Sequence, residues 1–106
     1  MEKVLKEIRR IREEREWKPF HTPENLAKSI AIESGELLEH FQWDNQHKLD
    51  EVSDELADVM IYCLYMADAL GVSAEEIMLK KIEKNEKKYP VSKSKGNSRK
   101  YTEFND

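Results

Sequence analysis

Two short acidic motifs in this 106-residue chain carry the residue types and the spacing that metal chemistry requires. Glu33 and Glu36 form one pair, and Glu55 and Asp58 form the other. Residues three apart share a face of an α-helix, so each motif directs two carboxylates the same way. Two helices packed side by side would therefore bring four carboxylates together beside a hydrophobic core.

Glu33 is the least expected of these acids, because it falls within the apolar stripe formed by Leu26, Ile30 and Leu37. An ionised carboxylate in such a stripe is costly unless it is paired or binds a metal. Oxygen donors without His or Cys favour a hard cation, Mg²⁺ or Mn²⁺, which keeps positions open for water and substrate phosphates. The motifs thus indicate phosphate-ester or phosphoanhydride chemistry. The alternative is ordinary solvated helix faces, in a chain where 38% of the residues are charged.

The spacing of apolar residues predicts an all-α chain without strands or internal repeats. Thr22 and Pro23 are typical of a helix start, Gly71 of a helix end, and Ser73 of the cap that begins the fourth helix. We expect a helical catalytic domain over residues 1–91 and a basic tail over 92–106. The four helices are predicted over residues 1 to about 16, 23 to about 41, about 48 to 70, and 74 to about 89. In the last of them, Ile77 and Ile82 are expected to face inward.

The third predicted helix is apolar over much of its circumference, which is typical of a helix buried on more than one side. Cys63 is expected to be a small core residue within its main apolar stripe, to which Leu56 also belongs. The other apolar residues predict a subunit interface in a homo-oligomer, since a small domain has a thin core. They are Met60, Ile61, Tyr62, Leu64 and Tyr65. The alternative is that these residues face the first and fourth helices of the same chain.

Composition argues against two classes of partner. The net charge is −4, with 18 basic and 22 acidic residues, so no nucleic-acid footprint is evident. No apolar run is long enough to span a bilayer, and the start does not resemble a signal sequence, so no membrane partner is expected. We therefore expect a cytoplasmic protein.

Aromatic residues flank the second predicted helix, with Trp17 and His21 before it and Trp43 after it. A flat apolar pocket with polar edges suits a nucleobase, and His21 and Asn25 are candidates to contact base or sugar edges. The alternatives are packing at the helix ends and an Asn25 that serves the helix cap. One face of the fourth helix could contact phosphates through Lys81, Asn85 and Lys88, and the alternative for Lys88 is a solvated Lys-rich helix end.

The acidic pairs are separated by 18 residues, between Glu36 and Glu55, and this arrangement resembles the MazG-like, all-α nucleotide pyrophosphohydrolases. The dCTP pyrophosphatase branch is the more similar one. The resemblance covers nearly the whole chain and rests on the order of several motifs, none of them specific alone. These are residues 14–26, 35–37, 41–43, 55–62, 81–90 and 98–103.

The resemblance implies a four-helix MazG-like bundle completed by homo-oligomerisation, as a homodimer or homotetramer. It also implies Mg²⁺-dependent hydrolysis of a (deoxy)nucleoside triphosphate, dCTP or a related dNTP, to the monophosphate and pyrophosphate, in the service of nucleotide-pool cleansing. The family's metal-binding acids match Glu33, Glu36, Glu55 and Asp58, and either Glu33 or Glu36 would be the general base.

Further residues match the family's substrate site. Its base and sugar pocket matches Trp17, His21, Asn25, Trp43 and Tyr62. Candidate phosphate contacts are Lys81, Asn85, Arg99, Lys100 and Tyr101. Two departures, a highly charged first helix and a short loop between the acidic pairs, bear on the preferred base. The competing interpretations are a non-enzymatic helical interaction module and a metal-dependent phosphatase that releases orthophosphate.

Overall fold

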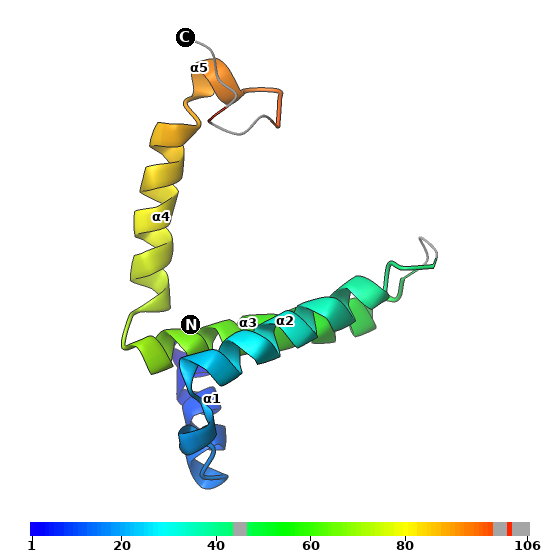
Figure 1. Cartoon of the computed structure of the whole chain (residues 1–106), viewed down its shortest axis with the longest axis vertical. Helices are drawn as coiled ribbons and strands as arrows, with labels where there is room; N and C mark the ends of the chain where they lie inside the picture. Colours follow the sequence, from blue (N-terminus) through cyan, green and yellow to red (C-terminus); the bar gives the residue numbers. More distant parts are fainter. Residues whose placement is uncertain (44–46, 99–101, 103–106) are drawn as a thin grey trace. The chain divides into compact units, whose positions relative to one another are not determined.

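The computed structural model describes residues 1–43, 47–98 and 102, and every regular element among them is helical (Figure 1). The predicted all-α class is confirmed. The chain divides into two compact units, residues 1–72 and 73–106. The first unit holds α1 (Glu2–Glu14), the short 3-10 helix η1 (Lys18–Phe20), α2 (Pro23–Glu39) and α3 (Leu49–Leu70).

The first helix ends in a turn that sets the direction of the residues after it. Glu16 adopts a left-handed backbone with φ of 54°, and its N–H donates to the Glu13 carbonyl at 3.1 Å. The Trp17 N–H donates to the Arg12 carbonyl at 3.0 Å. This pair of bonds is a Schellman motif, in which the left-handed position is usually Gly. It leads the chain directly from α1 into η1.

The predicted signals at the ends of α2 and α3 are confirmed. Thr22 caps α2, because its side-chain oxygen accepts a hydrogen bond from the Asn25 N–H at 3.2 Å, and Pro23 is the first helical residue. Gly71 ends α3 in the left-handed conformation, with φ of 69°, which costs a glycine little.

In the first unit α2 and α3 lie side by side along their lengths, and α1 contacts α3 (Figure 1). The buried apolar residues are Ile8 of α1, Leu26 of α2, and Leu64, Tyr65 and Ala67 of α3. Polar contacts hold α1 in place: the Tyr65 hydroxyl donates to the Ile8 carbonyl, and Arg9 donates twice to Asp68 at 2.7 and 2.9 Å. Arg12 also donates to Asp68, at 3.2 Å.

The predicted faces of α3 are partly wrong. Cys63, expected in the core, is exposed, and so is Leu56 of the same predicted stripe. Leu64 and Tyr65, expected at a subunit interface, are buried inside the unit instead. The reason is that α3 is apolar nearly all round, so periodicity cannot tell which face its neighbours cover. Met60 does remain exposed, as expected of an interface residue.

The second unit contains α4 (Ala74–Lys88) and the one-turn helix α5 (Val91–Ser94). Ser73 caps α4 as predicted, accepting a hydrogen bond from the Glu76 N–H at 3.2 Å. Ile77 and Ile82, expected to face inward, are about half exposed, because this unit holds only α5 as a second described helix. The predicted domain boundary after residue 91 stays a prediction.

None of the helices in the described part of the chain is by itself long and apolar enough to cross a membrane.

Candidate metal centre and adjoining cavity

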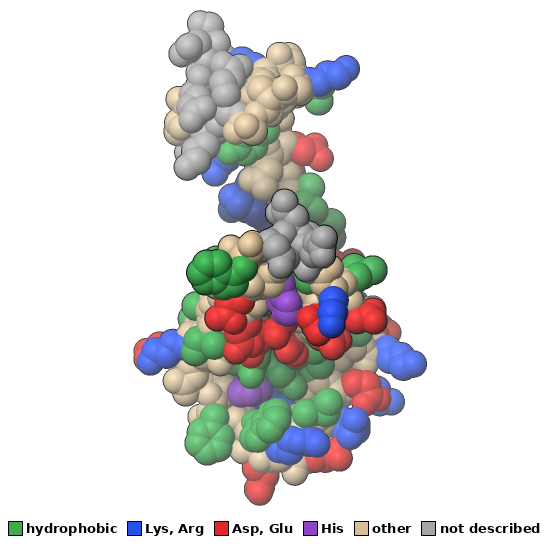
Figure 2. Space-filling model, turned by 90° about the vertical axis from the view of Figure 1, so that its right-hand side faces the viewer, with side chains coloured by type: hydrophobic (Ala, Val, Ile, Leu, Met, Phe, Trp, Pro, Cys, Tyr) green, Lys and Arg blue, Asp and Glu red, His purple; other side chains and the backbone are tan. Residues whose placement is uncertain are grey.

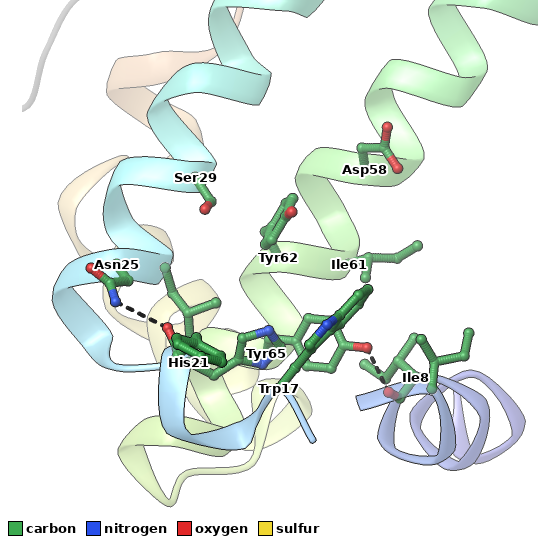
Figure 3. A pocket seen from close by; sticks show the side chains of 12 residues that line it. Ile8, Trp17, His21, Asn25, Ser29, Asp58, Ile61, Tyr62 and Tyr65 are labelled. Atoms are coloured by element: carbon green, nitrogen blue, oxygen red, sulfur yellow. Dashed lines mark hydrogen bonds between the residues drawn. The ribbon is translucent and has the colours of Figure 1, made fainter. Parts of the chain in front are cut away.

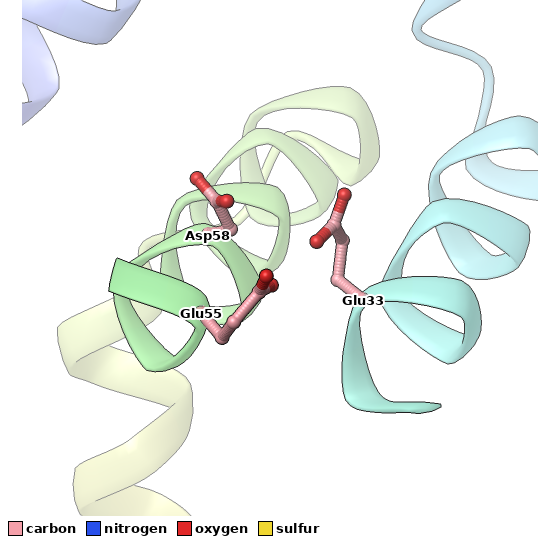
Figure 4. A group of neighbouring side chains, drawn as sticks. All are labelled: Glu33, Glu55 and Asp58. Carbon is pink, nitrogen blue, oxygen red and sulfur yellow. The ribbon is translucent and has the colours of Figure 1, made fainter. Parts of the chain in front are cut away.

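Three of the four predicted acids converge between α2 and α3. Each of Glu33, Glu55 and Asp58 offers a carboxylate oxygen, and these oxygens lie within 4.8 Å of one another (Figure 4). Glu33 projects from α2, whereas Glu55 and Asp58 project from successive turns of α3. Figure 2 shows acidic side chains gathered on one face of the first unit, with hydrophobic side chains beside them.

The electrostatics of this cluster favour a cation. The loss of solvent around Glu33, and then the carboxylates of Glu36, Asp58 and Glu55, raise the pKa of Glu33 to about 7. One oxygen of Glu33 and one of Glu55 are buried without a hydrogen-bond partner. Unpaired carboxylate oxygens in an oxygen-only set fit a hard divalent cation, which would satisfy them and relieve the repulsion.

Glu36 lies at the edge of the cluster. Its side chain is exposed, and its carboxylate, one turn along the same helix, helps to raise the pKa of Glu33. It is not among the three acids whose oxygens converge. The structure therefore separates the four acids into a converging group of three and a neighbour beside it.

A cavity of about 480 Å³ adjoins the acidic cluster, within the size range of small-ligand sites. Four of the predicted substrate residues line it, namely Trp17, His21, Asn25 and Tyr62 (Figure 3). Asp58 lines it too, so this residue belongs both to the cavity and to the acidic cluster. One continuous site results, with carboxylates at one end and aromatic rings at the other.

The aromatic end of the cavity is built on η1 and α3. The His21 and Tyr65 rings pack with centroids 4.5 Å apart, and Trp17 lies 6.3 Å from His21. Arg15 sits over the Trp17 ring at 5.6 Å, a cation–π contact that limits its motion. Partial burial and the Arg12 guanidinium lower the pKa of His21, so its imidazole is neutral near pH 7.

Asn25 has two separate roles. Its backbone N–H completes the α2 cap, and its side-chain Nδ2 donates to the Phe20 carbonyl at 3.1 Å. The amide therefore fastens η1 to the start of α2, which confirms the capping interpretation. Its position in the lining leaves the base or sugar contact as a prediction.

The other predicted site residues are not among the described residues that line this cavity. Trp43 follows α2, is 86% exposed and does not line the cavity. Lys81 and Asn85 are exposed on α4 in the second unit. Three candidate phosphate contacts lie outside the described residues: Arg99, Lys100 and Tyr101.

The cavity also uses residues that the sequence analysis missed. Ser29 lines it from α2, and Ile61 and Tyr65 line it from α3. A helical signal for Ser29 was present, because it lies four residues after Asn25 and four before Glu33. No comparable signal marked α1, which contributes Ile8 and Ile11, since nothing in its pattern specifies where it docks.

Comparison with known proteins agrees with this arrangement. A model of the MazG-like family matches residues 28–104. The dCTP pyrophosphatase 1 proteins of Mus musculus and Homo sapiens are each 34% identical over 117 residues, covering 97% of this chain and 69% of theirs. A pyrophosphatase crystal structure from Archaeoglobus fulgidus has a TM-score of 0.75 and 44% identity, covering 85% of this chain and 92% of that one. The family match takes in all four acids and Tyr62.

Proposed function

The chain belongs to the MazG-like family and is a nucleoside triphosphate pyrophosphohydrolase, and we propose that it acts with Mg²⁺ on dCTP or a related deoxynucleotide. The products are the monophosphate and pyrophosphate. The name of the curated relatives, dCTP pyrophosphatase 1, supports this substrate. In the cell such an activity would cleanse the nucleotide pool.

The observation that carries the proposal is that Asp58 belongs both to the acidic cluster and to the wall of the cavity. A nucleoside triphosphate matches the two ends of this site, because it has a charged phosphate chain at one end and a flat aromatic base at the other. A cation held by the carboxylates would bind its phosphates, and its base would stack near Trp17 and His21.

Glu33, Glu55 and Asp58 would hold the cation. Bound Mg²⁺ supplies charge neutralisation for the triphosphate and lowers the pKa of water. Glu36, exposed beside Glu33 and outside the converging group, would accept the proton of the water that attacks the α-phosphorus. Glu33 is the other candidate for that role. The bond between the α-phosphorus and the bridging oxygen breaks, and the pair of electrons leaves with pyrophosphate.

The apolar walls of the cavity would exclude water from the base, and the neutral His21 can donate or accept one hydrogen bond. Tyr62 lies one helical turn from Asp58 and is positioned for the sugar. We keep Trp43 as a base contact, and five further residues as contacts to the β- and γ-phosphates. These are Lys81, Asn85, Arg99, Lys100 and Tyr101.

We also propose that the chain works as a homo-oligomer, a homodimer or homotetramer. Leu56, Met60 and Cys63 share one face of α3, and all three are exposed. A second copy that covers this face would enlarge a core in which only five apolar residues of the described chain are buried.

A panel assay tests the activity. The protein is incubated with each common dNTP and NTP in the presence of Mg²⁺, and monophosphate, diphosphate, pyrophosphate and orthophosphate are resolved. We expect monophosphate and pyrophosphate, with dCTP among the best substrates. Glu33→Gln should lower kcat by at least about 100-fold and abolish Mg²⁺ binding in calorimetry, because it removes one converging oxygen anion.

The matched control is Glu39→Gln, an exposed acid on the same helix, which should retain both activity and Mg²⁺ binding. Orthophosphate in place of pyrophosphate would replace the proposal with a phosphatase. No turnover of any nucleotide and no Mg²⁺ binding by the wild type would leave the non-enzymatic interaction module.

A further inference from the structure

The proposed site has a middle as well as two ends, and Ser29 lies there. Asn25, Ser29 and Glu33 follow one another at intervals of four residues on α2, so they share a face. Each interval advances about 6 Å along the helix axis. Asn25 belongs to the aromatic end of the cavity and Glu33 to the acidic cluster, and Ser29 lines the cavity between them.

Residues of the facing helix, α3, follow the same order from the acidic cluster to the aromatic end of the cavity. Asp58 belongs to the acidic cluster, Tyr62 follows one turn later, and Tyr65 packs against His21 at the aromatic end. Figure 3 shows Ser29 of α2 and Tyr62 of α3 in the space between the two helices, where both line the cavity. Two hydroxyl groups therefore flank the part of the cavity that joins its two ends.

The polar groups of this cavity differ in whether their hydrogen-bonding capacity is already used within the protein. The Tyr65 hydroxyl already donates to the Ile8 carbonyl, and the Asn25 side-chain nitrogen already donates to the Phe20 carbonyl. Ser29 is half-buried, and its hydroxyl makes no hydrogen bond to any residue in the described part of the chain. It is therefore a donor and an acceptor that a ligand can use.

In a nucleotide, the sugar is the segment that joins the base to the phosphates. We propose that Ser29 is a specificity-determining residue that hydrogen-bonds a hydroxyl group of the substrate's sugar, an inference that rests on the proposed function. A substrate that fills the cavity displaces water from Ser29, so the serine hydroxyl needs a partner from that substrate. A site built to hydrogen-bond a substrate hydroxyl discriminates against an analogue that lacks it.

The test is a thermodynamic cycle in which the Ser29 hydroxyl and the sugar hydroxyls of the substrate are removed separately and together. The values of kcat/KM are measured for wild type and Ser29→Ala with the ribo-, 2′-deoxyribo- and 2′,3′-dideoxyribonucleoside triphosphates of the preferred base. Ser29→Ala should lower kcat/KM by about 3- to 10-fold for the substrates that carry the contacted hydroxyl, mainly through KM. For the dideoxy substrate the change should be less than about twofold, because no sugar hydroxyl remains to bind.

Two further variants serve as controls. Ser29→Thr keeps the hydroxyl and should retain the discrimination, whereas Ser53→Ala removes an exposed hydroxyl from α3 and should change nothing. Alanine favours helix, so Ser29→Ala is expected to fold. A loss confined to the ribonucleotide would identify the 2′-hydroxyl, and a loss shared with the deoxyribonucleotide would identify the 3′-hydroxyl.

An equal loss with all three sugars, or no loss with any, would overturn the assignment of Ser29 and leave the hydrolase standing. The absence of turnover by the wild type with every nucleotide would instead overturn the proposed function, and this inference with it.

Discussion

At the scale of single residues, the Glu33 carboxyl controls how the site responds to protons and metal. Its ordinary pKa near 4.5 is raised to about 7 in the folded chain, first by lost solvent and then by neighbouring carboxylates. The folded state therefore binds this proton more tightly than the unfolded state does. It follows that the metal-free protein loses stability as the pH rises from the ordinary value through 7.

We expect Glu33→Gln to raise the melting temperature of the metal-free protein at about pH 8, because the amide cannot ionise, and to change it little at about pH 5. Differential scanning calorimetry in chelator measures both values. Added Mg²⁺ should stabilise the wild type more than the variant, since it binds only the folded site. Glu39→Gln should show none of these effects, and identical melting curves for wild type and Glu33→Gln at the higher pH would contradict the prediction.

At the scale of elements, α1 is attached to α3 through a small, partly buried polar network, and this attachment shapes one wall of the cavity. Asp68 receives hydrogen bonds from Arg9 and Arg12, and Arg12 is itself buried. These bonds, that from Arg9 first, lower the pKa of Asp68. A lowered carboxyl pKa contributes stability above the ordinary value, and this contribution is lost as the pH falls through the folded-state value.

Asp68→Asn should therefore lower the free energy of unfolding by about 1–3 kcal/mol at neutral pH, because two guanidinium groups lose a charged partner. The difference from wild type should shrink as the pH falls below the ordinary carboxyl pKa. Urea denaturation across a pH series measures it. Asp54→Asn, an exposed acid on the same helix, is the control, and a pH-independent difference would contradict the role of the charge.

The turn after α1 provides a second element-scale prediction. Glu16 occupies a left-handed position at which a side chain is strained and glycine is not. We expect Glu16→Gly to raise the free energy of unfolding by up to about 1 kcal/mol, with kcat/KM unchanged, since the Schellman bonds that direct Trp17 are backbone bonds. A destabilised variant would show that the Glu16 side chain has a stabilising contact of its own.

The sequence predicted the ends of the helices better than it predicted which helix faces are buried. The helix ends followed from local chemistry, because Thr22, Gly71 and Ser73 act within their own turns. The position of Glu33 in an apolar stripe likewise marked the acidic cluster. Cys63 was misplaced because α3 has more than one apolar face. Ser29 was missed although it shares a helix face with Asn25 and Glu33, because that spacing alone does not show that a facing helix closes a cavity over it.

At the scale of the whole molecule, the outward face of α3 is the feature that the single chain does not explain. Leu56 and Met60 are 47% and 54% exposed, and Cys63 lies on the same face one turn later. Contiguous apolar residues on a surface are typical of protein–protein interfaces. On α2, Ile32 and Leu38 are also exposed.

A charge in the middle of this face should separate the copies. We expect Met60→Glu to lower the molar mass measured by sedimentation equilibrium, because an unpaired carboxylate cannot be buried cheaply between apolar surfaces. The melting temperature of the wild type should rise with protein concentration, and that of the variant should rise less. Asp54→Lys, which changes the charge on another face of α3, should keep the wild-type mass. A wild-type protein that is monomeric at all concentrations would contradict the proposed oligomer, whereas an unchanged mass in Met60→Glu would move the interface to a different surface.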